Sequence, residues 1–231
     1  MKHSPHTRIG VLGGAFNPVH HGHLAMATHA QQVLALDQVL FIPSGDHPPH
    51  KAGTTLAPAH HRLAMVKHAI ADRPHFTVSD IEARASSTSY TVETIHTLRQ
   101  CMKGVLWFLI GLDAFLQIAS WRSVATLISS TNFLVLSRPT ARFSQVTSLT
   151  LLPPPPTEQL DRLDDGTRTR LDVSTGPHAV LTLLRMPPCQ VSASAIRTRI
   201  QEGLDVTDWL PPSVHSYIIR HRVYGLREGE T

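Results

Sequence analysis

The chain has 231 residues, of which 42% are hydrophobic and 16% charged, and its formal net charge is +4. A chain of this length and composition can bury a full core, so we expect a single domain over residues 1–231. The mild positive charge suits small anionic ligands as well as nucleic acid. The basic C-terminal residues lack interleaved aromatic side chains, so we expect no nucleic-acid partner.

The two cysteines indicate a reducing compartment. Cys101 and Cys189 form neither a C-x-x-C motif nor a disulfide framework, so we expect two small buried thiols and a cytoplasmic protein. The polar start shows no signal peptide, and the longest apolar run, residues 105–110, is far too short to span a bilayer. We therefore expect a soluble protein with no membrane partner.

Short apolar runs alternate with segments of helical periodicity along the chain. A strand at residues 8–12 leads through glycines to a helix that begins near Leu24. The following elements are predicted in chain order: strand 39–42, helix 56–71, strand 76–78, helix 91–102, strand 105–110, helix 123–130 and strand 133–136. This alternation predicts an α/β protein with a Rossmann-like, doubly wound parallel sheet.

Residues 138–188 interrupt this rhythm. Four prolines at 153–156 favour an extended polyproline conformation, and the polar run at 161–169 has too few apolar residues for a core element. We therefore expect an irregular surface excursion over about 138–188, with a last strand at 178–184 near its end. Two closing helices are predicted at 194–201 and 211–221, within a C-terminal helical part that extends to about residue 224.

The first chemical motif follows the first strand and reads G-G-A-F-N-P-V-H-H-G-H from Gly13 to His23. Gly13 and Gly14 permit close backbone approach and positive φ angles. The amides at a helix N-terminus attract anions, and His20 and His23 could both reach a phosphate from this turn. No P-loop or G-x-G-x-x-G pattern fits these glycines. The motif therefore indicates a phosphate-transfer site.

This motif resembles the G-G-x-F-[DN]-P-x-H-x-G-H signature of the nucleotidyltransferase superfamily, whose H-x-G-H pair supports transfer of a nucleotide monophosphate. Many members carry Asp at the position of Asn17. A second resemblance, to S-[ST]-T-x-I-R, starts at Ser192, with Ala193 and Ser194 in place of the commoner hydroxyl residues. Arg197 ends this motif and offers a charge-assisted phosphate contact, while the hydroxyls at the helix start can cap it.

The remaining motifs narrow the resemblance to one family. A proline-stiffened P-P-H-K loop ends in Lys51, and S-Y-T, G-x-D-A and a following tryptophan appear at 89–91, 111–114 and 121. Together they resemble bacterial nicotinate-nucleotide adenylyltransferases over nearly the whole chain. The resemblance implies that amides near Tyr90 and Thr91 hold the pyridine carboxylate, Trp121 stacks on the ring and Asp113 contacts the ATP ribose.

The resemblance implies transfer of AMP from ATP to nicotinate mononucleotide, with Mg²⁺ bound to the triphosphate. The expected catalytic residues are His20, His23, Lys51 and Arg197. The expected ATP-binding residues are Gly13, Gly14, Ala15, Phe16, His23, Gly111, Asp113, Ser192, Ser194 and Arg197. The expected mononucleotide-binding residues are Asn17, Lys51, Tyr90, Thr91 and Trp121.

Three alternatives remain open at this point. Another nucleotidyltransferase of the superfamily would use nicotinamide mononucleotide, phosphopantetheine or a cytidylyl acceptor with the same phosphate loops. A nucleotide sensor would keep the fold without the chemistry. A metal site at His20, His21 and His23 is disfavoured because no cysteine or acidic residue is spaced with them, so we expect no metal ligands in the protein. Taken alone, Trp121 and Tyr90 would more often be core or rim aromatics.

Overall fold

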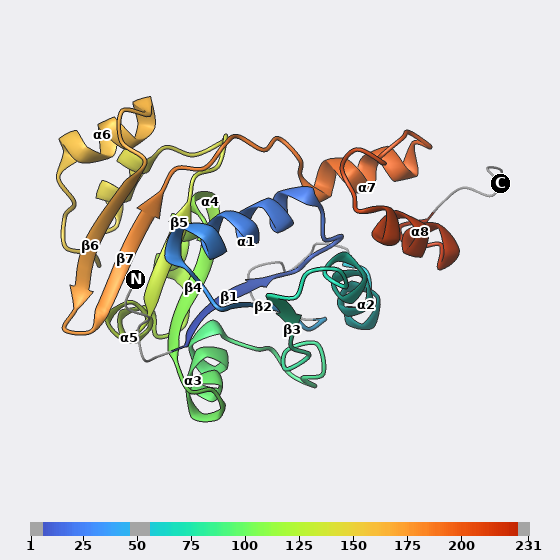
Figure 1. Ribbon diagram of the computed structural model, residues 1–231, viewed down its shortest axis with the longest axis horizontal. Helices are drawn as coiled ribbons and strands as arrows, with labels where there is room; N and C mark the ends of the chain where they lie inside the picture. The colour runs from blue at the N-terminus through green and yellow to red at the C-terminus, as the bar shows by residue number, and fades with distance from the viewer. Residues whose placement is uncertain (1–6, 47–55, 226–231) are drawn as a thin grey trace. The chain divides into compact units, whose positions relative to one another are not determined.

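The computed structural model describes residues 7–46 and 56–225. Its strands form one seven-stranded sheet with the order β3-β2-β1-β4-β5-β7-β6 (Figure 1). The strands are β1 (Arg8–Gly14), β2 (Gln38–Pro43), β3 (Phe76–Val78), β4 (Val105–Gly111), β5 (Asn132–Leu136), β6 (Arg170–Gly176) and β7 (Ala179–Leu184). The strand order runs outward in both directions from β1 and β4, which confirms the doubly wound α/β fold.

The sheet is parallel except at one edge. The pairs β1–β4, β2–β3, β4–β5 and β5–β7 are all parallel, and Val11 lies opposite Phe108 in the first of them. Strand β6 instead pairs antiparallel with β7. The helices are α1 (His21–Leu34), α2 (Ala59–Ala69), α3 (Thr91–Cys101), α4 (Leu112–Phe115), α5 (Val124–Ser130), α6 (Thr157–Asp165), α7 (Ala193–Gln201) and α8 (Pro212–Arg220).

Residue contacts divide the chain into two compact units, and the chain passes between them several times. The first unit comprises residues 7–12, 26–37 and 90–189, and the second comprises 13–25, 38–46, 56–89 and 190–225. The single-domain organisation stays a prediction. In the first unit, the apolar residues of β4 and β5 form the centre of the core, with Leu134 and Val135 completely buried. Helix α3 buries one face through Thr94, Ile95 and Leu98.

In the second unit, helix α2 packs on β2 and β3 and also against α8. Its buried side chains include Met65, Val66 and, unusually, the charged Arg62. Helix α8 buries Val214 and Ile218, and its Tyr217 hydroxyl lies 3.0 Å from Nδ1 of His61 on α2. Apolar residues spaced three or four apart therefore hold the two helices together.

The expectation of an irregular excursion over residues 138–188 is wrong for most of that segment. It contains α6, β6, β7 and a 3₁₀ helix at Phe143–Ser148, visible in yellow and orange in Figure 1. Leu160 and Leu163 on α6 are buried, as is Leu171 on β6. Three well-spaced leucines are thus enough to bury one face of each element. The expected last strand is confirmed as β7.

The cysteine expectation also needs a correction. Both thiols are free, but Cys101 is exposed at the end of α3 and Cys189 is only half-buried. None of the helices in the described part of the chain combines the length and apolar character that a membrane-spanning segment requires.

Candidate active site

The turn after β1 is fixed by a buried aromatic ring. Phe16 is 2% exposed, and its ring meets the His23 ring at a centroid distance of 5.0 Å and an angle of 64°. The positive φ that the sequence predicted for the glycines falls instead on Phe16, at 47°. A left-handed conformation is uncommon for a bulky residue, so this turn is held by its surroundings. The turn then delivers His20 and His23 to the start of α1.

The two histidines have a defined tautomer. The Gly22 N–H donates to Nδ1 of His20 at 3.1 Å, and the His20 N–H donates to Nδ1 of His23 at 3.3 Å. A backbone N–H is always a donor, so each Nδ1 must accept. In the neutral form of each ring, this hydrogen-bond network assigns the ring proton to Nε2. Each ring can therefore donate from Nε2, as contact with a phosphate oxygen requires.

The second motif lies with the first in the same unit. Arg197 donates from Nη1 to the backbone oxygen of Asn17 at 2.8 Å. This contact joins the first turns of α7 to the turn after β1 across 180 positions of sequence. The Asn17 side chain, which is only 3% exposed, accepts from the Ala57 N–H at 3.0 Å. Its amide oxygen therefore has a structural partner within the protein.

Ser192, and not Ser194, caps α7. The Ser192 hydroxyl accepts from the Ala195 N–H at 3.2 Å and lies 3.3 Å from the Ser194 hydroxyl. The two hydroxyls are thus neighbours at the helix N-terminus, where an anion is favoured. Lys51 lies outside the described residues.

In the other unit, Tyr90 and Thr91 form the start of α3, which has Tyr90 as its N-cap residue. Backbone amides at this position suit a carboxylate. The Arg122 guanidinium lies over the Tyr90 ring at 4.5 Å, and Arg122 also pairs with Glu93 at 3.2 Å. The Tyr90 ring is thus held in place by a cation–π contact.

Trp121 is half-buried and meets Phe108 of β4 edge-on, with the centroids 6.0 Å apart. Gly111 ends β4, and Asp113 follows it in the short helix α4. The Asp113 carboxylate is exposed and lies 3.7 Å from Nε of Arg138. Asp113 therefore has a cationic neighbour, Arg138, that was not predicted from the sequence.

Comparison with known proteins identifies the family. The family described as Cytidylyltransferase-like matches residues 11–199. A protein named "Probable nicotinate-nucleotide adenylyltransferase" from Synechococcus sp. is 37% identical over 220 residues, which cover 95% of this chain and 98% of that protein. A protein of the same name from Desulfitobacterium hafniense is 35% identical, with 96% and 97% covered. This chain belongs to the nicotinate-nucleotide adenylyltransferase family.

A solved structure supports the fold of this adenylyltransferase family member. Plasmodium falciparum nicotinic acid mononucleotide adenylyltransferase, described as complexed with NaAD, matches with a TM-score of 0.71. The two chains are 17% identical, and the match covers 97% of this chain and 100% of the other. At this level of identity the likeness concerns the fold.

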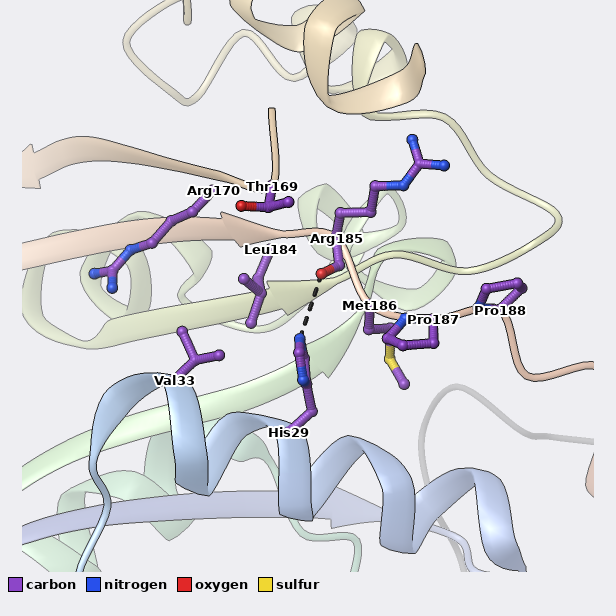
Figure 2. Close-up of a pocket in the computed structure, with 9 residues that line it drawn as sticks. All are labelled: His29, Val33, Thr169, Arg170, Leu184, Arg185, Met186, Pro187 and Pro188. Atoms are coloured by element: carbon purple, nitrogen blue, oxygen red, sulfur yellow. Dashed lines mark hydrogen bonds between the residues drawn. The ribbon is translucent and has the colours of Figure 1, made fainter. Parts of the chain in front are cut away.

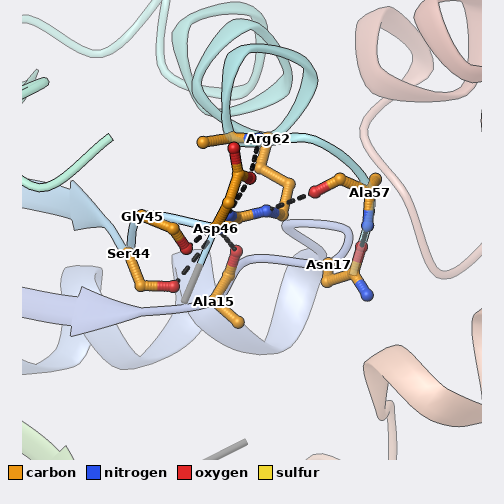
Figure 3. A network of polar contacts seen from close by, with 8 residues as sticks. Ala15, Asn17, Ser44, Gly45, Asp46, Ala57 and Arg62 are labelled. Carbon is orange, nitrogen blue, oxygen red and sulfur yellow. Dashed lines mark hydrogen bonds and ion pairs between the residues drawn. The ribbon is translucent and has the colours of Figure 1, made fainter. Parts of the chain in front are cut away.

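Sequence reasoning missed two polar groups of this adenylyltransferase family member near its predicted site residues. Arg62 is completely buried beside the turn after β1, where it donates to the Ala15 carbonyl (Figure 3). The Tyr224 hydroxyl is buried and has no hydrogen-bond partner among the described residues. Burial raises the pKa of Tyr224, while the charges of Arg197 and Arg62 oppose that rise. Neither residue was predictable, because Arg62 lies in a segment with an ordinary helical pattern and Tyr224 lies in a polar C-terminal segment.

A cavity of about 470 Å³ in the first unit contains none of the predicted site residues (Figure 2). His29 of α1 faces it and contacts the Arg185 carbonyl at 3.4 Å. Its two arginines are engaged elsewhere, since Arg170 pairs with Asp172 at 3.0 Å and Arg185 donates to the carbonyl of Leu163. This cavity therefore offers a mainly apolar lining and is not the phosphate site.

Proposed function

We propose that this protein transfers AMP from ATP to nicotinate mononucleotide and releases pyrophosphate, forming deamido-NAD. The observation that carries the proposal is that backbone N–H groups donate to Nδ1 of both His20 and His23 on the turn after β1, so that Nε2 is the donor atom of each ring. This pair occurs in a chain whose relatives bear the adenylyltransferase name over nearly their full length. The protein acts as an enzyme of NAD biosynthesis.

In this reaction, the 5′-phosphate oxygen of the mononucleotide attacks the α-phosphorus of ATP. The new P–O bond joins the two nucleotides, and the bond from the α-phosphorus to the bridging oxygen breaks with its electrons on pyrophosphate. The attacking phosphate is already an anion, so no protein nucleophile is needed. Catalysis then depends on positioning and on stabilising the charge that develops on the phosphate oxygens.

The phosphate contacts come from His20, His23, Lys51 and Arg197. Neutral Nε2–H donors stabilise the charge that builds on the α-phosphate, and the cations attract the leaving pyrophosphate. The remaining residues proposed to line the ATP phosphates and ribose are Gly13, Gly14, Ala15, Phe16, Gly111, Asp113, Ser192 and Ser194.

The acceptor is recognised by Asn17, Lys51, Tyr90, Thr91 and Trp121. The amides at the start of α3 favour a carboxylate over a neutral carboxamide because of the partial positive charge there. Arg122 lies nearby, but Glu93 neutralises its charge. Selection of nicotinate over nicotinamide therefore rests on these amides. Trp121 stacks on the pyridine ring.

Magnesium enters this scheme with ATP. Among the described residues, no group of three or more histidine, cysteine or acidic side chains could hold a metal ion. Mg²⁺ commonly binds through substrate phosphates with few protein ligands. We therefore propose that Mg²⁺ reaches the site bound to the triphosphate. The free thiols of Cys101 and Cys189 fit a reducing cytoplasm.

An acceptor panel tests this function. Pyrophosphate release is measured with ATP and nicotinate mononucleotide, nicotinamide mononucleotide or phosphopantetheine, and with CTP in place of ATP. We expect the highest kcat/KM with ATP and nicotinate mononucleotide. Activity only with phosphopantetheine would assign the chain to another branch of the superfamily. Nucleotide binding with no release of pyrophosphate from the nucleotide, whichever acceptor is added, would make it a sensor.

A further inference from the structure

Arg62 of α2 is the largest completely buried side chain among the described residues, at 0% exposure. All of its guanidinium nitrogens donate hydrogen bonds (Figure 3). Nε donates to the Ala57 oxygen at 2.7 Å, Nη1 to the Ala15 oxygen at 2.9 Å and to Ser44 Oγ at 3.2 Å, and Nη2 to the Gly45 oxygen at 2.8 Å.

The charge of Arg62 is poorly matched within this network. Among the described residues, its one carboxylate contact is Asp46, at 3.4 Å, and the Asp46 side chain is 56% exposed. Most of its partners are neutral carbonyl oxygens. Burial lowers the pKa of Arg62, and Asp46 only opposes that shift. A buried cation of this kind is costly, so stability alone gives little reason for an arginine here.

The bonds of Arg62 instead join three separate segments. Ala15 belongs to the turn after β1, Ser44 and Gly45 follow β2, and Ala57 precedes α2. The Ala57 N–H also donates to the Asn17 side chain. The amide and the carbonyl of Ala57 therefore both connect the segment before α2 to the turn after β1 and to Arg62. The rigid fork of a guanidinium is suited to hold several acceptors at fixed angles.

The segments that Arg62 joins carry the proposed phosphate chemistry. His20 and His23 follow the Ala15 turn by a few residues, and Lys51 follows Gly45 by a few positions in the sequence. We propose that Arg62 is a positioning residue for adenylyl transfer, which fixes the turn after β1 relative to the end of β2 without touching substrate. This inference rests on the proposed function.

The variant Arg62→Lys separates geometry from charge. Lysine keeps the positive charge, but its single nitrogen cannot reach the Ala57, Ala15 and Gly45 oxygens together. The matched control is Met65→Ala, which truncates another completely buried side chain of the same helix, one that makes no hydrogen bonds among the described residues. Both variants are expected to lower Tm. A difference in kcat between them therefore reports an effect of Arg62 on catalysis that loss of stability does not explain.

We expect Arg62→Lys to lower kcat by about 10²-fold, the loss typical of a small misplacement remote from the reacting atoms, with a smaller change in KM for both substrates. Met65→Ala is expected to stay within about twofold of the wild-type kcat when assayed well below its Tm. Equal losses of kcat in the two variants, or near-normal turnover of Arg62→Lys, would overturn the inference.

An imidazole ¹⁵N spectrum gives a readout that does not need activity. The wild type should show His20 and His23 as Nε2-protonated tautomers, with Arg62→Lys shifting these signals and Met65→Ala leaving them unchanged. An inactive wild type would contradict the proposed function, yet the spectra would still decide the role of Arg62. If Arg62→Lys does not fold, Ser44→Ala replaces it, and unchanged spectra and kcat there would overturn the inference.

Discussion

The imidazole rings of His20 and His23 lie in contact, with their centroids 3.8 Å apart and their planes tilted by 38°. Because each Nδ1 accepts a backbone hydrogen bond, both rings can donate only from Nε2. We expect His20→Ala and His23→Ala each to lower kcat by roughly 10²–10³-fold, about 2.7–4 kcal/mol, as for loss of one preorganised donor. Steady-state kinetics on folded variants, checked by circular dichroism, measure this loss.

His21 supplies the matched control. It lies between the two rings in sequence, and its backbone N–H donates to the Trp209 oxygen at 3.1 Å. His21→Ala retains that backbone bond and should keep kcat within about threefold of wild type. Near-normal turnover of a folded His20 or His23 variant would show that its ring is not a transition-state donor.

Trp121→Ala should raise KM for the mononucleotide and leave KM for ATP nearly unchanged. Loss of a stacking platform weakens binding of that one substrate by about 1–3 kcal/mol, by analogy with base–aromatic stacking. Trp121 is half-buried and meets Phe108 edge-on, at a centroid distance of 6.0 Å. Kinetics with both substrates and thermal melting are run on the same variant.

The competing interpretation places Trp121 in the core. Truncating a core tryptophan costs about 3–5 kcal/mol of stability with little substrate selectivity. A large fall in Tm with both KM values unchanged would therefore remove Trp121 from the site. Trp121→Phe is the milder companion variant, since it keeps an aromatic face.

Acid should weaken the contact between α2 and α8 through His61. The pKa of His61 is lowered from 6.5 because burial and then the neighbouring His60 and His221 disfavour the cation, while its Nδ1 contacts Tyr217 Oη at 3.0 Å. The unfolded chain then takes up the proton first as the pH falls. The stability that His61 contributes is thus present above about pH 6.5 and is lost as the pH falls through the folded-state pKa.

The test compares Tm at about pH 8 and about pH 5.5. His61→Gln removes the titrating ring and should show a smaller loss of Tm between these values than the wild type. His68 on α2 also faces Tyr217, at a centroid distance of 5.3 Å, and stays in place in this variant. His96→Gln, at an exposed position of α3, is the control and should leave the pH dependence unchanged. Identical pH dependence in the wild type and His61→Gln would contradict this account.

Tyr224→Phe should stabilise the protein. The Tyr224 hydroxyl is buried and has no hydrogen-bond partner in the described part of the chain. Leaving a buried polar group unsatisfied costs about 1–3 kcal/mol, and phenylalanine keeps the ring while removing that group. We expect the free energy of unfolding to rise by about 1 kcal/mol, as measured by urea denaturation. A fall of similar size would show that the hydroxyl does have a partner.

The strands of the sheet other than β6 were predictable because they are continuous apolar runs. Residues 76–78 match β3, and 105–110 differ from β4 by one residue. The strand-to-helix turn with His20 and His23 was predictable for the same reason, since its residues are contiguous in sequence. Contiguous patterns thus gave both the fold class and the centre of the candidate site.

Other features depend on contacts between distant residues. Helix α6 was missed because only Leu160 and Leu163 form its apolar face within a strongly charged segment. Arg62 reads as one more polar residue of a helix, and its burial follows from acceptors on three separate segments. Ser192 caps α7, which begins at Ala193, one residue before the start expected from the sequence.

Transfer of label from ATP tests the central claim most directly. The protein is incubated with nicotinate mononucleotide, Mg²⁺ and ATP labelled at either the α- or the γ-phosphate, and the products are separated. The account predicts that α-label appears in a dinucleotide with the mass of deamido-NAD, that γ-label appears only in pyrophosphate, and that none remains on the protein. Label in free AMP alone, or covalently on the protein, would contradict direct adenylyl transfer.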